Sequence, residues 1–260
     1  MVVTNLFEYP VKGLLGHEIN CAIVNRRGLG MDRRWMLVDA GGNFISQREL
    51  STLTQFRPEY QDDLIIKHLP TADVRAIDKS VFSELLTVTV WGQECAAHGA
   101  SNGINQWFSD KLKIPVRLVF MGENDIRPVA SANNSDIVSF ADDSPVLLTT
   151  LASLSELNNR LADGVEINRF RPNILIDGVE PYAEDQWRNV KIGQVEFRVV
   201  KLCARCHNIN IDQHTGLAGK EPLKTLSTYR KVGNRVNFGV YLTPANEGII
   251  HEGDEVIVLN

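Results

Sequence analysis

Two cysteines and an arginine in the stretch Lys201-Leu-Cys-Ala-Arg-Cys-His207 are the residues best suited to metal or redox chemistry. Thiolates bind soft metals, and a neighbouring arginine, here Arg205, favours the thiolate over the thiol. A structural zinc site needs two further ligands, and no second Cys-x-x-Cys pair is present. A dithiol redox pair is expected at a helix that follows a strand, whereas residues 208–211 look like another strand. Three interpretations stay open: a lone metal ligand, a zinc or dithiol site, or two cysteines packed in the core.

Other segments place side chains that can bind an anion next to predicted strands. In Asp-Arg-Arg-Trp at 32–35, strand alternation must turn one arginine inward, where it needs an anionic partner such as Asp32 or a ligand phosphate. A lysine before a glycine can also bind an anion, and hydroxyl groups at a helix start, as at Thr149-Thr150, either cap the helix or bind an anion there. The candidate residues are Lys12, Arg33, Thr149, Thr150, Arg171 and Asn173.

Taken together, these residues form an anion-binding set with one thiolate. Such a set suits a phosphate-bearing cofactor with a soft metal better than it suits a protease or a nuclease.

Composition limits the partners of the chain. The 260 residues carry a formal net charge of -5, and 43% of them are hydrophobic. A protein this acidic has no general attraction for nucleic acid or for an anionic membrane. The N-terminus shows no secretory signal, and no apolar run is long enough to span a bilayer. We therefore expect a cytoplasmic protein that binds neither a nucleic acid polymer nor a membrane.

The elements that must position these residues are mostly short strands. Apolar and β-branched runs at strand length predict strands at 6–9, 18–24, 35–38, 44–46, 64–69, 86–91, 116–120, 174–176, 195–200, 236–242 and 256–259. The turn residues Gly41-Gly42-Asn43 predict a hairpin between 35–38 and 44–46. We expect a mainly β protein, barrel-like, with a few packed helices.

Helices are expected at three places. Apolar residues at helical spacing predict a helix over 102–113 and a second one that contains Leu154, Leu157 and Leu161. For the second helix, Ser153 and Glu156 fit a capping box and Gly164 fits the C-terminal stop. A third, short helix follows Pro222. The polar segment 121–143, with Asn133-Asn134-Ser135, is the best linker candidate, and it divides the chain into regions 1–122 and 123–260.

A set of motifs in a fixed order makes the chain resemble the MOSC-domain proteins, and among them the amidoxime-reducing components and their bacterial relatives. The motifs are Tyr-Pro-Val-Lys at 9–12, Asp-Arg-x-Trp at 32–35, Gln-Arg at 47–48, Phe-Arg-Pro-Asn at 170–173, Tyr-Ala-Glu-Asp-x-Trp at 182–187, Cys-x-Arg-Cys at 203–206, Asp-x-x-Thr-Gly at 212–216 and Lys-Glu-Pro-Leu at 220–223. The resemblance implies an N-terminal MOSC β-barrel region over 1–122 and a MOSC domain over 123–260.

The resemblance also implies a site. It assigns Cys206 as the protein's ligand to molybdenum in a molybdenum cofactor (molybdopterin), with Arg205 beside the metal. It assigns contacts with the cofactor to Lys12, Arg33, Arg171, Asn173 and Thr150, with Thr149 as the alternative hydroxyl. The implied activity is reduction of N-hydroxylated compounds, such as hydroxylaminopurines, hydroxylamines and amidoximes. The electrons are expected from a separate iron–sulfur or flavin protein.

Two other functions are compatible with the same residues. One is a carrier that handles the molybdenum cofactor or sulfur without turnover, in which Cys203 and Cys206 hold a persulfide. MOSC domains also end sulfurases, but the pyridoxal domain of those proteins is absent here, so we expect no pyridoxal phosphate. The other is a zinc or dithiol protein. Gly13, Ala204 and the residues 207–210 depart from the family pattern, which bears on the range of substrates.

Overall fold

The fold is built around one large sheet. The computed structural model describes residues 1–129 and 136–260. Nine strands form this sheet in the order β20-β15-β16-β18-β13-β14-β1-β3, with β17 paired to β18, and only the pair β13–β14 is parallel. The strands are β1 (Val2–Glu8), β3 (His17–Ile19), β13 (Val146–Thr150), β14 (Ile174–Asp177), β15 (Asn189–Ile192), β16 (Val195–Arg205), β17 (Lys231–Val232), β18 (Arg235–Pro244) and β20 (Val256–Val258).

Three smaller sheets complete the architecture. Five strands run in the order β10-β11-β12-β6-β2, and two three-stranded sheets have the orders β7-β8-β9 and β19-β4-β5. Their bounds are β2 (Val11–Lys12), β4 (Cys21–Asn25), β5 (Gly28–Leu29), β6 (Trp35–Val38), β7 (Phe56–Tyr60), β8 (Leu64–His68), β9 (Asp73–Ile77), β10 (Glu84–Val90), β11 (Gln93–Gly99), β12 (Arg117–Phe120) and β19 (Gly248–His251). The mainly β class is confirmed, although none of the four sheets that the described residues form closes on itself as a barrel.

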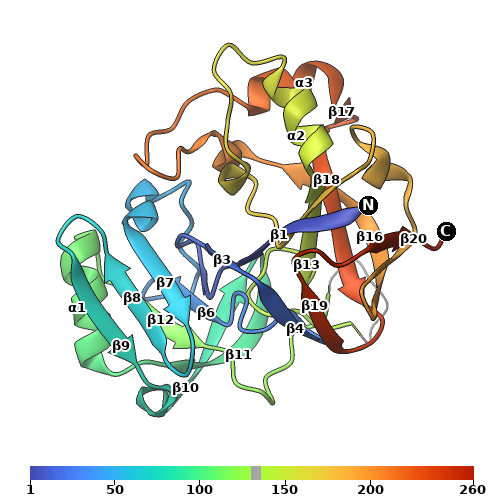
Figure 1. The fold of residues 1–260 in the computed structure, drawn as a ribbon. Coiled ribbons are helices and arrows are strands. Elements are labelled where there is room, and N and C mark those ends of the chain that lie inside the picture. The colour runs from blue at the N-terminus through green and yellow to red at the C-terminus, as the bar shows by residue number, and fades with distance from the viewer. Residues whose placement is uncertain (130–135) are drawn as a thin grey trace.

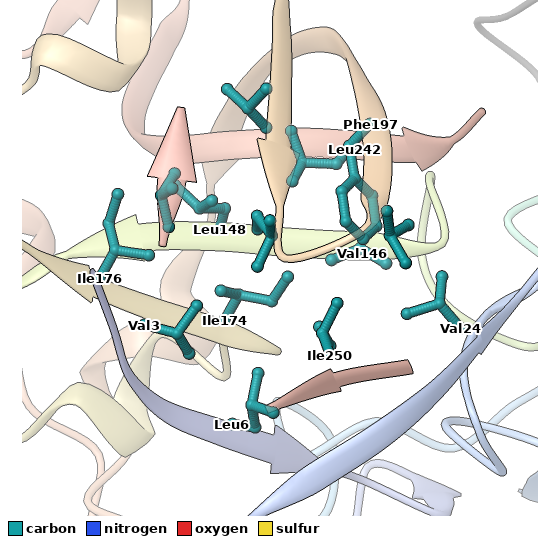
Figure 2. Close-up of a cluster of buried hydrophobic side chains, with 14 of the residues drawn as sticks. Val3, Leu6, Val24, Val146, Leu148, Ile174, Ile176, Phe197, Leu242 and Ile250 are labelled. Carbon is teal, nitrogen blue, oxygen red and sulfur yellow. The ribbon is translucent and has the colours of Figure 1, made fainter. Parts of the chain in front are cut away.

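The two halves of the chain share a sheet. In Figure 1, β7 to β12 lie in one lobe and β13 to β20 in the other, with β1, β3 and β4 between them. Strand β1 pairs with β14, and β4 pairs with β19. Side chains of the large sheet and of the three-stranded sheet β19-β4-β5 together form a single core, which includes Val3 and Leu6 from the start of the chain and Ile250 from near its end (Figure 2). The first strands therefore stabilise the second lobe, and the division at residue 122 stays a prediction.

The described residues form three α-helices that cover the sheets, α1 (Asn102–Leu112), α2 (Leu151–Asn158) and α3 (Leu223–Tyr229). The helix α1 buries Trp107 and Phe108 against Phe56, with ring centroids 5.8 and 5.4 Å from that of Phe56. The predictions for α1 and α3 are confirmed. The capping box of Ser153 and Glu156 is wrong. The expectation that a hydroxyl at the helix entrance caps α2 is confirmed at Thr150, whose hydroxyl accepts a hydrogen bond from the Ser153 amide at 3.0 Å. The helix also ends at Asn158, before Leu161 and Gly164.

Short 3-10 helices account for the remaining regular structure, at η1 (Ser51–Gln55), η2 (Lys79–Val81), η3 (Ile167–Arg169), η4 (Ala183–Gln186) and η5 (His207–Asn210). The strand expected at 208–211 is wrong, because the chain turns into η5 directly after Cys206. The strand expected at 18–24 breaks at Asn20 into β3 and β4, and Phe44 forms only an isolated bridge to Val38. The linker residues 133–135 lie outside the described residues.

Candidate active site

A pocket between the two lobes collects six of the eight predicted site residues. Strands β2, β16 and β18 and the loops before β6, β13 and β14 all contribute to it. The residues that line it and enter the discussion below are Lys12, Arg33, Phe44, Gln47, Arg48, Trp91, Asp142, Ser144, Arg169, Arg171, Asn173, Arg205, Cys206 and Tyr241. Six of these side chains are basic, and Asp142 is the one carboxylate in the described lining. The pocket is therefore strongly cationic within an acidic protein.

Two arginines of the pocket lining lie over the ring of Tyr9. The guanidinium carbons of Arg33 and Arg171 lie 4.2 and 4.4 Å from the centroid of the Tyr9 ring. Both residues have a positive φ, 50° and 54°. A non-glycine residue in this region costs about 1–3 kcal/mol and persists only where its surroundings fix it. The surrounding structure therefore holds both arginines in a strained backbone conformation that places their cations over one ring.

The partners of the two arginines differ. Arg33 donates to the buried Asp32 carboxylate at 2.5 Å and to the amide oxygen of Asn173 at 3.1 Å. Within the described part of the chain, Arg171 forms no hydrogen bond or ion pair with a carboxylate. Its guanidinium group instead lies over the ring of Tyr9. Burial, and then repulsion from Arg33, lower the pKa of Arg171 to about 10, so it stays charged at neutral pH. A half-buried cation without a counterion is suited to binding an anion.

The neighbouring arginine, Arg34, is a structural residue. Its guanidinium group is buried and donates to the carbonyl of Met121 at 2.6 Å and to Glu123 at 3.0 Å. The expectation that one of the two arginines turns inward is therefore too narrow. Both turn inward, Arg33 toward the pocket and Arg34 toward the loop after β12.

The two cysteines of the Cys-x-Arg-Cys motif have opposite environments. Cys203 is buried, and burial raises the pKa of its thiol above the usual value. Cys206 is exposed and lines the pocket at the point where β16 ends. Two irregularities in the pairing of β16 with β18, at 199–201 and 202–204, interrupt the alternation of inward and outward side chains. One cysteine is therefore a core residue, and the other is available to a ligand.

Two backbone carbonyls hold the side chain of Arg205, which lies between these two cysteines in the sequence. It donates to the carbonyl of Phe238 at 3.0 Å and to that of Phe170 at 3.1 Å. Its remaining terminal nitrogen, Nη2, is buried and has no partner among the described residues. A buried guanidinium nitrogen without a partner is costly unless a ligand accepts its hydrogen bond.

Lys12 and Asp142 form an ion pair at the side of the pocket. The ammonium of Lys12, which is buried, contacts the carboxylate of Asp142, and the indole nitrogen of Trp91 donates to the same carboxylate at 2.9 Å. Burial tends to raise the pKa of Asp142, but the charge and hydrogen bond of Lys12 and the Trp91 bond outweigh it and lower that pKa below the ordinary value. The carboxylate stays ionised and neutralises Lys12.

The remaining predicted residues are used inside the protein. Asn173 accepts from the Leu147 amide at 3.1 Å and donates to the Phe7 carbonyl at 3.3 Å, so it shapes the pocket wall. Thr149 and Thr150 are completely buried and do not line the pocket. Within residues 1–129 and 136–260, no three His, Cys, Asp or Glu side chains gather as a metal site made of protein ligands would require.

Sequence reasoning did not single out several lining residues. Asp142 and Ser144 lie in or directly after the segment assigned as a linker, where polar residues suggested only a loop. Trp91 and Tyr241 were read as parts of strands. Gln47 belongs to the Gln-Arg motif at 47–48, but that motif gave it no role in the site. It forms a reciprocal amide pair with Gln213 at 3.0 Å and also donates to the Gly13 carbonyl at 2.8 Å. These residues meet only through contacts between segments that are distant in the sequence, and no local sequence pattern indicates those contacts.

Known protein families match both regions of the chain. Residues 1–115 match a family model described as the MOSC N-terminal beta barrel domain, and residues 135–257 match one described as the MOSC domain. The chain is 34% identical to mitochondrial amidoxime-reducing component 1 of Mus musculus over 278 residues, which covers 99% of this chain and 82% of that protein. The Homo sapiens protein of the same name is 33% identical, with the same coverage of 99% and 82%.

A further relative has a different name. The molybdenum cofactor sulfurase of Oryza sativa subsp. japonica is 31% identical over 264 residues, which is 92% of this chain but 32% of that protein. No helix that the described residues form is both long and apolar enough to cross a bilayer.

Proposed function

The chain belongs to the MOSC-domain family, and from that premise we propose that it is a molybdenum-cofactor oxidoreductase that reduces N-hydroxylated compounds. A separate iron–sulfur or flavin protein delivers the electrons. The region 1–122 acts as the N-terminal β-barrel domain and 123–260 as the MOSC domain proper. The observation that carries the proposal is the exposed Cys206 thiol at a pocket with six basic side chains and one carboxylate.

The residues of the pocket fit such a cofactor. Cys206 supplies a thiolate, the ligand that suits a soft metal. Arg171, which has no carboxylate partner, and the unpartnered Nη2 of Arg205 supply the cationic donors that a phosphate requires. When bound, the cofactor supplies the two-electron chemistry that breaks an N–O bond.

The protein side chains hold and tune this arrangement. Asp32 and Asn173 hold the charged group of Arg33 in the pocket lining, and two backbone carbonyls hold the side chain of Arg205 beside Cys206 in the same lining. Asp142 limits the positive charge near Lys12. Because these groups are set before anything binds, little free energy is lost in ordering them.

The similarity to a molybdenum cofactor sulfurase supports one alternative, a carrier of the cofactor or of sulfur. A persulfide relay between Cys203 and Cys206 is disfavoured, because Cys203 is buried and its pKa is raised. The alternative is separated by turnover: a carrier binds molybdenum but does not reduce an N-hydroxylated compound when an electron donor is supplied.

The test is metal analysis of freshly purified protein with matched cysteine variants. We expect stoichiometric molybdenum in the parent protein, in Cys203→Ala and in Cys21→Ala, and none in Cys206→Ser. Cys21 is the control for an exposed thiol, and alanine suits the buried position of Cys203. A zinc or dithiol site would suffer from loss of either Cys203 or Cys206. Absence of molybdenum from the parent after reconstitution with the cofactor would refute the proposal.

A further inference from the structure

Trp91 occupies an unusual position at the tip of the β10–β11 hairpin. It has φ 53° and the following Gly92 has φ 77°, and Val90 pairs with Gln93 across the turn. Two-residue turns with both φ values positive favour Asn, Asp or Gly at the first position, because a bulky side chain is strained there. A strained bulky residue that also lines a pocket suggests a role beyond folding.

The side chain of Trp91 is held in place while its ring stays accessible. Its indole nitrogen donates to Asp142 at 2.9 Å, and its ring centroid lies 5.0 Å from that of Phe44. The guanidinium carbon of Arg48 lies over the ring, 4.7 Å from the centroid. Even so, 51% of the residue is exposed, whereas Trp35, Trp107 and Trp187 are 0%, 6% and 9% exposed.

A second link connects the hairpin to the segment that carries Asp142. The buried Arg127 donates to the side-chain oxygen of Gln93 at 3.0 Å, to the Ser139 carbonyl at 2.8 Å and to the Ala141 carbonyl at 2.7 Å. Two interactions therefore position the ring of Trp91: the hydrogen bond from its indole N–H to Asp142, and the hydrogen bond from Arg127 to Gln93, the residue after the turn. Such a fixed, half-exposed ring is a preorganised surface for stacking.

From these contacts we propose that Trp91 is a specificity-determining residue, a platform on which the planar aromatic part of an N-hydroxylated substrate stacks. The inference rests on the proposed function and extends it, since it names the preferred substrates as aromatic rather than aliphatic. Arg127 acts as a positioning residue for the platform. Stacking on an aromatic side chain is typically worth about 1–3 kcal/mol in nucleobase-binding proteins, which corresponds to an effect of about fivefold to 150-fold on binding.

The first test measures binding without turnover. The full chain is labelled with 5-fluorotryptophan, which yields one ¹⁹F signal for each of its four tryptophans, and the Trp91 signal is identified by its loss in Trp91→Phe. Benzamide and cyclohexanecarboxamide are titrated in parallel, because both are neutral, similar in size and free of an N–O bond. We expect benzamide alone to shift the Trp91 signal in a saturable way. Equal shifts with both compounds, or none, would overturn the platform.

The second test compares two substrates with two variants. Trp91→Asn preserves the turn, because asparagine favours a positive φ, and it removes the ring. Trp91→Phe keeps a ring but loses the hydrogen bond to Asp142. We expect the ratio of kcat/KM for benzamidoxime to that for acetamidoxime to fall about tenfold in Trp91→Asn, through KM, and by less than threefold in Trp91→Phe.

The outcomes separate the two proposals. Equal losses on both substrates, or identical ratios in both variants, would show that Trp91 acts only through Asp142 and would overturn the platform. If the parent protein reduces neither substrate, the proposed function fails, and the benzamide titration still decides whether Trp91 binds an aromatic ring.

Discussion

The pocket and the polar network beneath α2 both gather polar groups away from solvent, but they differ in whether their charged groups can be neutralised within the protein. In the network, the Thr150 hydroxyl donates to Ser153 at 2.7 Å, and Ser153 donates to Glu184 at 2.9 Å. Burial raises the pKa of Glu184 to about 7, so its carboxyl group can take up a proton. In the pocket, the pKa of Arg171 is lowered only to about 10, so this residue remains charged. A buried carboxyl can neutralise itself, whereas a buried arginine needs an anion from elsewhere.

This difference explains why hydroxyl residues at a helix start and arginines near a strand have different fates. Thr150 satisfies the backbone of α2 and is complete without a ligand. Arg171 and the Nη2 of Arg205 are incomplete within the described residues. Four predictions test this comparison, in which unmatched cations of the pocket require a ligand and the network beneath α2 is complete through its own hydrogen bonds.

The largest expected effect is on folding, at the ion pair between Arg33 and the buried Asp32. Arg33→Met leaves the Asp32 carboxylate buried without its partner, so we expect the free energy of unfolding to fall by about 3–5 kcal/mol. Urea denaturation measures this loss. The double variant Asp32→Asn with Arg33→Met removes both charges and is expected to recover most of it. If the double variant is as unstable as the single one, the charge of Asp32 is not the cause.

The next effect depends on pH and belongs to the network. Because the pKa of Glu184 is raised above the unfolded value of 4.5 to about 7, the folded state holds its proton more tightly and loses stability as pH rises between these values. Glu184→Gln lacks this loss. We expect the variant to gain up to about 3 kcal/mol relative to the parent between pH 4.5 and pH 7, as followed by urea denaturation. A gap that does not vary with pH would contradict a neutral Glu184.

A smaller effect is expected for the unmatched cation of the pocket. Arg171→Gln should lower the affinity for the cofactor about tenfold or more, because a charged donor to an anion is lost. The unfolding free energy of the cofactor-free protein should stay the same or rise, since a half-buried cation without a counterion is removed. Molybdenum content after dialysis and urea denaturation give the two readouts. Arg57→Gln, an exposed position on β7, is the matched control. Loss of stability without loss of cofactor would assign Arg171 to the structure alone.

The smallest effect separates the helix cap from the pocket. Thr150→Ala should cost about 1 kcal/mol of stability, the usual value for a lost N-cap, and leave molybdenum content unchanged. Thr149→Val is the control, because the buried hydroxyl of Thr149 has no partner among the described residues. Loss of molybdenum in either variant would restore the expectation that these threonines contact the cofactor.

Local patterns were sufficient for much of the fold. Apolar runs located β6, β8 and β12 to within one residue at each end, since the strands are short and bounded by turn residues. The helix α1 follows from its period alone. The errors at α2 and η5 have a common cause. Capping and the direction of the chain after Cys206 depend on which backbone groups the neighbouring strands leave free, and a sequence window does not contain that information.

The chemical groups available to the site can be identified from the residues alone: a thiol beside an arginine, basic residues next to strands, and the order of motifs that marks the family. Which of these groups meet depends on the tertiary structure. It buried Cys203 and exposed Cys206, matched Arg33 with Asp32 while it left Arg171 unmatched, and brought Trp91 to the pocket from a distant hairpin. The physical reason is that burial and charge balance are sums over neighbours in space, and in a sheet most of those neighbours are remote in sequence.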